Sequence, residues 1–403
     1  MSIAKVNNMC CGCRNCVNVC PEKAVSFATD KYGFEFPSVD PDLCKECNLC
    51  SVACPALSEL FNEKHYKSGI AYALDSKTKY HGSSGGLFGV FAKQTLLDGG
   101  IVFGAAFDSH LKLKTSFAEN EEDLFPLYKS KYLLCDTADS FVKMQTELEK
   151  GRNLLYCSSP CQISALRLFL GKEYKNLLTV DFVCHGVGSQ EFFDKSINHL
   201  EKQLSAKILS FNFRYKKGNA ASHYYYYYYE RDGAKFKKSD LYLSFPYYNA
   251  YEKQLICRDS CYLCKYAVES RVSDITIGDF HNIRKYDKSI DRLAGVSMFV
   301  CNTEKGNEFF EKVSPKMFVK SLEWEELRIN NRFSNDNKNI PKSHETFMQA
   351  MVSSAFDKVV HDFLRPIKDW KWLIYYKSPK KIRDLLVYIH DKMPLIIGKF
   401  IRN

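Results

Sequence analysis

The sequence predicts a mixed α/β (α+β) protein in which a small cysteine-rich domain precedes a larger domain with a mixed sheet and a helical, basic C-terminal tail. Three observations predict this order. Two copies of one cysteine pattern fill residues 1–57, buried apolar runs alternate with helical patterns over 70–330, and polar helical segments that become basic make up 331–403. These three ranges are the expected domains.

The composition of the 403 residues excludes several classes of protein. Apolar residues make up 45% of the chain and charged residues 26%, which is typical of a globular protein and not of a disordered one. The net charge is +10, but ten Lys or Arg and only three Asp lie in 365–403, so the rest is mildly basic. No recognisable nucleic-acid-binding module accompanies this charge, and we expect no nucleic-acid partner.

The cysteine usage and hydropathy indicate a cytoplasmic protein. The first nine residues contain no apolar signal segment, and no uncharged apolar run reaches the ~18 residues that span a bilayer. Seventeen cysteines in the cytoplasm are expected to be metal ligands or reactive thiols rather than disulfides. In the tail, aromatic residues alternate with lysines over 368–377, which predicts either peripheral contact with an anionic membrane surface or packing on the body.

The decisive motif is a repeated Cys-x2-Cys-x2-Cys-x3-Cys-Pro pattern in the first domain. Three closely spaced thiolates hold three corners of an iron–sulfur cubane, and the fourth cysteine points to the neighbouring cluster. We therefore predict two [4Fe–4S] clusters, one held by Cys10, Cys13, Cys16 and Cys54, and the other by Cys44, Cys47, Cys50 and Cys20.

Zinc is the alternative for these cysteines, but zinc needs only four ligands and gains nothing from an exchanged fourth cysteine. Cys11 lies outside the pattern and is predicted to be a spare thiol. Short strands at 25–27 and 34–37, with a turn at 31–33, predict a hairpin between the two patterns. The domain resembles a bacterial-type two-cluster ferredoxin.

The larger domain is expected to build a largely parallel sheet covered by helices. Strands are predicted at 100–107, 153–157, 177–183 and 274–278, and helices at 83–98, 140–150, 162–170 and 190–203. Residues 58–68 are predicted to form a helical linker. Residues 208–245 are predicted to be antiparallel, with turns at 217–218 and 232–233, and the six tyrosines 224–229 are expected to be a strand rather than an aromatic wall beside a cofactor.

Four short sequence motifs, called islands below, follow one another along this domain. They are His81-Gly-Ser-Ser-Gly-Gly-Leu-Phe, Ser158-Ser-Pro-Cys-Gln, Asp181-Phe-Val-Cys-His-Gly-Val, and Ser260-Cys-Tyr-Leu-Cys-Lys followed by 273–280. Together they resemble the beta subunit of coenzyme F-420-reducing hydrogenase and dehydrogenase over about residues 70–330. One departure is that the family's Gly-Thr-Pro-Cys is Ser158-Ser-Pro-Cys here, which loses a glycine that allows close backbone approach.

The resemblance implies an FAD-dependent module that exchanges a hydride with a substrate and electrons with iron–sulfur clusters. Members act on the deazaflavin coenzyme or on other substrates such as a chlorophyll derivative, and many bacterial members accompany polysaccharide biosynthesis. The expected partner is accordingly a redox protein such as a ferredoxin, or a small-molecule hydride donor or acceptor.

Candidate cofactor-binding residues lie in three places. Ser83, Ser84, Gly85 and Gly86 open a predicted helix, whose free N–H groups could hold the FAD pyrophosphate; an ordinary serine cap with packing glycines is the alternative. Lys131 matches a family segment of the Gly-Ser-Lys-Tyr type and could stabilise reduced, anionic flavin, or be a solvated lysine. Asp279, at a strand end, could bind flavin or substrate, or cap a turn.

Further cysteines of the body are candidates for a third [4Fe–4S] cluster between the flavin and the ferredoxin domain. They are Cys161, Cys184, Cys261 and Cys264. Zinc or plain buried thiols are the alternatives. His185 is the candidate catalytic residue, as a shuttle for the proton that accompanies hydride transfer, or else it supports the neighbouring cysteine.

The predicted function is an iron–sulfur flavoprotein oxidoreductase. The first alternative is an electron-transfer subunit whose active site belongs to a partner. The second is a radical S-adenosylmethionine enzyme, since Cys257-x3-Cys261-x2-Cys264 has the spacing of that class. Only about 140 residues follow this triplet, where most of a barrel would have to lie, so the second alternative is disfavoured.

Overall fold

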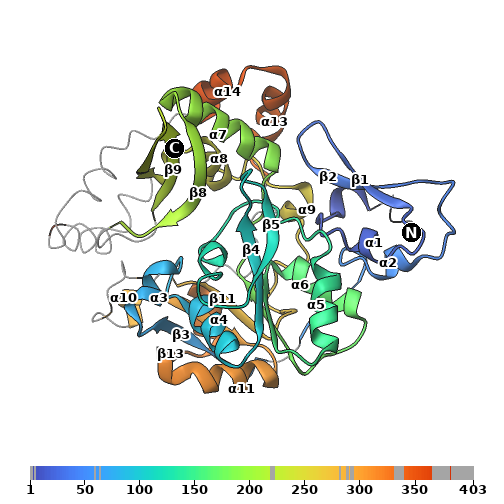
Figure 1. The fold of residues 1–403 in the computed structure, drawn as a ribbon, viewed down its shortest axis with the longest axis vertical. Coiled ribbons are helices and arrows are strands. Elements are labelled where there is room, and N and C mark those ends of the chain that lie inside the picture. Colours follow the sequence, from blue (N-terminus) through green and yellow to red (C-terminus); the bar gives the residue numbers. More distant parts are fainter. Residues whose placement is uncertain are drawn as a thin grey trace.

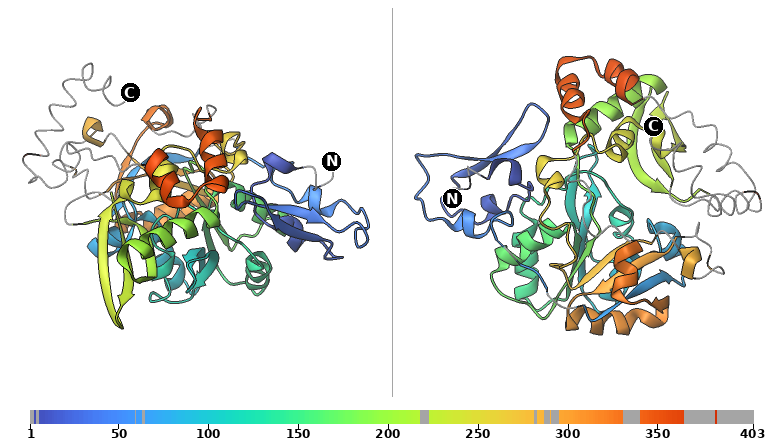
Figure 2. Two further views of the ribbon diagram at one scale, coloured as in Figure 1. Left: turned by 90° about the horizontal axis from the view of Figure 1, so that it is seen from above. Right: turned by 180° about the vertical axis from the view of Figure 1, so that it is seen from behind.

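The computed structural model describes residues 3, 6–58, 60–62, 65–217, 223–280, 283–286, 290, 295–330, 340–364 and 382. A small N-terminal domain lies to one side of a larger body that contains two sheets (Figures 1 and 2). The chain is therefore a mixed α/β protein with a separate small first domain, as the sequence predicts. None of the described helices is long and apolar enough to cross a membrane.

The N-terminal domain repeats one local structure around its two cysteine patterns. Helices α1 (Asn15–Asn18) and α2 (Leu49–Val52) each contain the third cysteine of a pattern, and each follows a residue in the left-handed conformation, Arg14 (φ 58°) or Asn48 (φ 64°). A 3-10 helix, η2 (Asn7–Met9), precedes them. The predicted hairpin is confirmed as β1 (Val25–Thr29) and β2 (Glu35–Val39), which pair antiparallel.

The body is organised around an eight-stranded mixed sheet. In spatial order its strands are β13 (Met317–Ser321), β3 (Lys67–Ala73), β12 (Ser297–Cys301), β11 (Ile275–Asp279), β7 (Leu177–Phe182), β6 (Leu154–Ser158), β4 (Ile101–Phe107) and β5 (Leu113–Ala118). The strands β11, β7, β6 and β4 run parallel to one another, and the outer strands pair antiparallel. The four strands that the sequence predicts are these four central ones.

Helices bury both faces of this sheet. The helices α4 (Leu87–Leu97) and α11 (Glu304–Val313) cover one face. On the other face, α5 (Ser140–Glu149) and α6 (Pro160–Leu170) cover β4, β6 and β7. On the same face, α10 (Ile283–Tyr286) and α12 (Trp324–Asn330) cover β3 and β12. Successive residues of β6 alternate between the two cores, since Leu155 packs with α4 while Leu154 and Tyr156 pack with α5 and α6. Burial of both faces explains the continuous apolar runs of the central strands.

A second layer packs against the carboxyl edge of the large sheet (Figure 1). It consists of the antiparallel strands β8 (Lys207–Tyr215), β9 (Tyr224–Arg231) and β10 (Ala234–Leu241) and of helices α7 (Gln190–Leu204), α8 (Pro246–Glu252), α13 (His344–Ser353) and α14 (Phe356–Phe363). The turn at Asp232 and Gly233 is confirmed, with φ of 51° and 75°. The tyrosine run is strand β9, in which Tyr225 and Tyr227 are buried in this core.

The shorter helices connect these layers. They are α3 (Ser76–His81) and α9 (Asp259–Tyr262), with 3-10 helices η3 (Phe125–Leu127), η4 (Tyr242–Ser244) and η6 (Ser314–Lys316). The predicted helices at 140–150, 162–170 and 190–203 are confirmed as α5, α6 and α7.

Two local predictions differ from the structure. The helical linker at 58–68 is wrong: its described residues form no helix, Asn62 pairs with Arg271 through a β-bridge, and β3 begins at Lys67. The helix predicted from Ser83 begins only at Leu87, because Gly86 adopts φ 86°, which ends the preceding loop and cannot continue a helix.

The C-terminal tail is described only in part. Helices α13 and α14 occupy 344–363, in agreement with the predicted helical character. The aromatic and basic residues 368–377, on which the predicted membrane contact depends, lie outside the described residues, as does Gly218 of the turn expected at 217–218.

The buried carboxylate of Asp274 joins three elements of the body, and we expect its removal to be costly. Its Oδ2 accepts hydrogen bonds from the N–H and the hydroxyl of Thr179 on β7, both at 2.8 Å, and its Oδ1 accepts one from Thr303 at the start of α11, also at 2.8 Å. Asp274→Ala should therefore lower the free energy of unfolding by about 2–4 kcal/mol, since buried donors lose their acceptor.

A surface carboxylate provides the control for this experiment. Asp98 pairs with Lys312 at 2.7 Å between partly exposed side chains, and Asp98→Ala should cost less than about 1 kcal/mol. Urea denaturation of both variants measures the difference. Equal losses would contradict the role assigned to Asp274.

Candidate functional site

The two cysteine patterns of the N-terminal domain are interleaved in space. Cys54 lies beside Cys10 and Cys16, and Cys20 lies beside Cys50, so each fourth cysteine adjoins the triplet of the other pattern. Burial in a small apolar core raises the pKa of the Cys16 thiol to about 12. Iron would hold such thiols as thiolates, so the arrangement fits two cubanes that exchange their fourth ligands.

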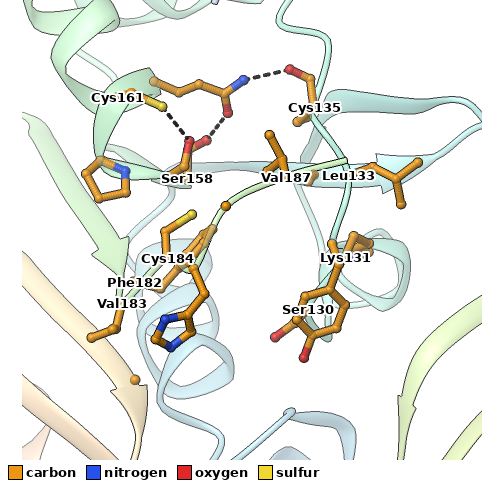
Figure 3. Close-up of a pocket in the computed structure, with 18 of the residues that line it drawn as sticks. Ser130, Lys131, Leu133, Cys135, Ser158, Cys161, Phe182, Val183, Cys184 and Val187 are labelled. Atoms are coloured by element: carbon orange, nitrogen blue, oxygen red, sulfur yellow. Dashed lines mark hydrogen bonds between the residues drawn. The ribbon is translucent and has the colours of Figure 1, made fainter. Parts of the chain in front are cut away.

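The candidate site of the body lies at the carboxyl edge of the parallel strands. Strand β6 ends at Ser158, β7 at Phe182 and β11 at Asp279, and their parallel pairing brings these ends to one edge. The segments after β6 and β7, together with the end of β11, line a cavity of about 970 Å³ (Figure 3). Open α/β sheets bind ligands at this edge, and cavities of this size hold cofactors.

Four cysteines from three segments meet in the cavity wall. Cys161 is the second residue of α6, Cys184 follows β7, Cys261 lies in α9, and Cys264 follows α9. Figure 3 shows Cys161 and Cys184 projecting from adjacent segments toward the same part of the cavity. All four thiols interact electrostatically with one another. Burial raises the pKa of Cys184 to about 12 and that of Cys264 to about 11.

The donor set of these four cysteines fits an iron–sulfur cubane. Across the described residues, no three Cys, His, Asp or Glu side chains converge closely enough to hold one metal ion. A cubane needs a wider spacing, because each of its four thiolates binds a different iron. Bound iron would hold these buried thiols as thiolates.

The loop before α4 is fixed by its own hydrogen bonds. The Ser83 hydroxyl accepts from the N–H and the hydroxyl of Ser130, at 2.7 and 3.0 Å, and the Ser84 hydroxyl donates to the Val296 carbonyl at 2.7 Å. The Gly85 N–H donates to the Ser297 hydroxyl at 2.9 Å. Ser83, Ser84, Gly86 and the first turn of α4 line the cavity, whereas Gly85 does not.

Three lysines near this loop have lowered pKa values. Lys131 donates to the carbonyls of Pro126 and Tyr128, at 2.8 and 2.7 Å, and burial lowers its pKa to about 7. Burial also lowers the pKa of Lys129 to about 8 and that of Lys216 to about 7. Lys129 adopts φ 70°, a conformation that glycine takes most easily.

An arginine that the sequence analysis missed completes the site. Arg214, on β8, donates to the Asp279 carboxylate at 3.0 Å and to the Tyr132 hydroxyl at 2.8 Å. Its Nε is buried and, among the described residues, has no hydrogen-bond partner. Asp279 thus forms an ion pair at the cavity. The available signal was a single arginine within the aromatic run Phe211-Asn-Phe-Arg-Tyr.

His185 and Cys257 lie next to the cysteine group. His185 lines the cavity beside Cys184. The thiol of Cys257 interacts with the His185 carbonyl at 3.8 Å and with Gln254 Oε1 at 3.5 Å. The described strands form open sheets instead of a partial barrel, so the fold does not support the radical S-adenosylmethionine alternative.

Comparison with protein families identifies two parts of the chain. Residues 9–57 match a 4Fe–4S dicluster domain, and residues 151–326 match the C terminus of the coenzyme F420 hydrogenase/dehydrogenase beta subunit. Residues 151–326 are thus a domain of the coenzyme F420 hydrogenase/dehydrogenase beta-subunit family. This beta-subunit domain contains the four body cysteines, His185 and Asp279, while Ser83–Gly86 and Lys131 precede it. The resemblance inferred from the islands is confirmed, as is the two-cluster type of the first domain.

Two known proteins are similar to parts of this chain. The coenzyme F420-dependent sulfite reductase of Methanocaldococcus jannaschii is 26% identical over 352 residues, covering 80% of this chain and 48% of the relative. A polyferredoxin-like protein of that organism is 36% identical over 66 residues, covering 14% of this chain and 39% of the relative. The chain spans about half the length of the first relative and less of the second.

A solved structure is also similar in part. A chain of the F420-reducing [NiFe] hydrogenase complex from Methanosarcina barkeri has 18% identity and a TM-score of 0.45, and the match covers 75% of this chain and 97% of that chain.

Titration of Lys131 should make stability depend on pH. Its folded pKa is about 7 and its ordinary value is 10.5, so below about pH 7 the folded protein carries the cost of a buried charge. As the pH rises above 7 the folded lysine becomes neutral while the unfolded one stays charged, so the unfolded state binds more protons and stability rises with pH. The free energy of unfolding of the wild type, minus that of Lys131→Met, should increase between about pH 7 and pH 10.

Urea denaturation of ligand-free protein at several pH values measures this difference. Lys131→Arg is the matched control, because its guanidinium stays charged over the whole range. If the difference in free energy of unfolding between the wild type and Lys131→Met does not change with pH, Lys131 titrates normally.

Proposed function

We propose that the protein is an iron–sulfur flavoprotein oxidoreductase that binds FAD in the cavity and a third [4Fe–4S] cluster at the cavity wall. One observation carries this proposal. The same cavity is bounded by the Ser83–Gly86 loop with its neighbouring cations and by the four buried cysteines Cys161, Cys184, Cys261 and Cys264. A two-electron cofactor would therefore lie directly beside a one-electron cluster.

The loop and its cations are suited to the FAD pyrophosphate. The first turn of α4 faces the cavity, where the positive end of the helix dipole and its free N–H groups favour an anion. The buried Nε–H of Arg214 can donate a hydrogen bond to the pyrophosphate, and Lys129 adds a second cation at the cavity. Since Gly85 uses its N–H on Ser297, we assign the contact to Ser83, Ser84 and Gly86.

Lys131 is proposed to stabilise the reduced, anionic flavin. Burial makes its charged form unfavourable in the protein alone, and an adjacent anion would restore the charge. Asp279 and Arg214 form an ion pair at the cavity, and Arg214 also donates to the Ser83 carbonyl at 3.3 Å. The pair therefore lies beside the Ser83–Gly86 loop and is proposed to position the cofactor or substrate there. His185, next to Cys184, is proposed to carry the proton that accompanies hydride transfer.

The bound flavin would supply hydride exchange with a substrate and single-electron exchange with the clusters. The substrate is proposed to be a small hydride donor or acceptor, and the coenzyme F420 named in the sulfite reductase relative is one candidate. A redox protein is proposed to exchange electrons at the ferredoxin domain. No sulfite-reducing site is proposed, because the chain spans about half of that relative. A role in polysaccharide biosynthesis stays a prediction from the resemblance.

Cofactor content tests the proposal and separates it from a relay without an active site. Anaerobically purified protein should contain about twelve irons and one flavin. Cys261→Ser and Cys264→Ser should each remove about four irons and leave the ferredoxin clusters unchanged in their electron paramagnetic resonance signals. Cys257→Ser is the control and should retain all the iron, because this thiol is not an assigned ligand. About eight irons and no flavin in the wild type would favour the relay.

Flavin binding should depend on the backbone at Gly86. Gly86 has φ 86°, and an added Cβ would lie 2.9 Å from Lys79 Cα, so Gly86→Ala must deform the loop. We expect flavin affinity to fall by about tenfold or more, given about 1–3 kcal/mol of backbone strain. Gly99→Ala is the matched control, since Gly99 has φ 73° but open space around it.

Fluorescence titration of flavin-depleted protein with FAD measures both variants, and their iron content should be unchanged. Equal losses of affinity in the two variants would place the flavin away from the Ser83–Gly86 loop.

A further inference from the structure

The thiol of Cys11, which stands outside the ferredoxin pattern, lies where the two domains meet. Its side chain is within hydrogen-bonding reach of Cys13 on one side and of Cys161 on the other. Cys11 and Cys161 also line the same cavity, and both pack against the core that contains Cys13. Cys13 is assigned to the first ferredoxin cluster and Cys161 to the third cluster, so Cys11 stands between ligands of two different clusters.

Hydrogen bonds fix this meeting point on both sides of Cys11. The main-chain carbonyl of Cys10 accepts from the Arg258 guanidinium at 2.5 Å, and that of Cys13 accepts from the Thr137 hydroxyl at 2.8 Å. The Asn15 amide donates to the Ala165 carbonyl of α6 at 3.0 Å. Asn15 and Arg258 are fully buried, so this contact excludes water and has a defined geometry.

The backbone next to Cys11 is equally constrained. Gly12 adopts φ 69°, and a Cβ at this position would lie 2.6 Å from Leu134 Cδ2. The loop therefore presses directly on the body at Gly12. Helix α6, which carries Cys161 in its first turn, is tied to the same loop through Asn15. These contacts hold Cys11 in place between the two ligands.

We propose that Cys11 is a positioning residue that couples the first ferredoxin cluster to the third cluster. This inference rests on the proposed function, because it requires the third cluster. The Cys11 thiol fills the space between the ligand sulfurs Cys13 and Cys161 and donates its S–H to one of these thiolates at a time. It is not itself a ligand.

The expected chemical effect is on reduction potential. A hydrogen bond to a ligand thiolate stabilises the reduced, more negative cluster and so raises its potential. The transfer across this contact moves one electron: the donating cluster is oxidised, the accepting cluster is reduced, and Cys11 keeps its proton and forms no bond. The electrons come from the substrate hydride or from the redox partner named in the proposed function.

Cys11→Ala tests the inference by potential and by iron content. The variant should retain about twelve irons. The equilibrium constant for reduction of at least one of the two clusters should fall by about tenfold, which lowers its one-electron reduction potential by about 59 mV. Redox titration followed by electron paramagnetic resonance measures the potentials. Cys11→Ser should largely restore them, because serine keeps a hydrogen-bond donor at this position.

Cys301→Ala is the matched control, since it removes a fully buried thiol of β12 that packs in a different core. Its cluster potentials should equal those of the wild type. Unchanged potentials in Cys11→Ala, or the loss of about four irons, would overturn the inference, the latter by making Cys11 a ligand. About eight irons in the wild type itself would instead overturn the third cluster and the proposed function.

Discussion

Parallel pairing of β6, β7 and β11 brings together residues that are far apart in the chain. Each of these strands ends at the same edge of the sheet, so the segments after Ser158 and Phe182 and the end of β11 at Asp279 form one cavity wall. The second layer then closes this edge and delivers Arg214 to Asp279. The parallel pairing of β6 with β7 thus places Cys161 and Cys184 at one edge, where they are joined by Cys261 of α9 and by Cys264.

Burial acts on the two kinds of titratable group in the cavity in opposite directions. It lowers the pKa values of Lys129 and Lys131 and raises those of cysteines such as Cys184. In both cases the neutral form is favoured. An anionic flavin and an iron–sulfur cluster are ligands that would restore the charged forms, so the proposed cofactors compensate the electrostatic cost that the fold creates.

The ferredoxin domain joins the body through hydrogen bonds to main-chain carbonyls as well as through apolar packing, in which Phe34 is buried in the core of the second layer. Arg258, Thr137 and Asn15 each satisfy a carbonyl across the contact, and the Tyr266 hydroxyl donates to the Pro55 carbonyl at 2.7 Å. Directional bonds of this kind fix orientation more strictly than apolar packing does. Strict orientation is what electron transfer between neighbouring clusters requires.

The sequence by itself determined the features whose residues are close together in the chain. The cysteine patterns, the hairpin between them and the strands β4, β6, β7 and β11 were predicted correctly, because local spacing and buried apolar runs define them. Strands β3, β5 and β13 were not predicted because lysine and serine interrupt their apolar residues, and β12 was missed although all five of its residues are buried.

Only the tertiary structure decided how Arg214 reaches Asp279 and how Cys11 reaches Cys161. These contacts join residues that are distant in sequence and belong to separate layers or domains. Periodicity reports which face of an element is buried, but it carries no information about which other element covers that face.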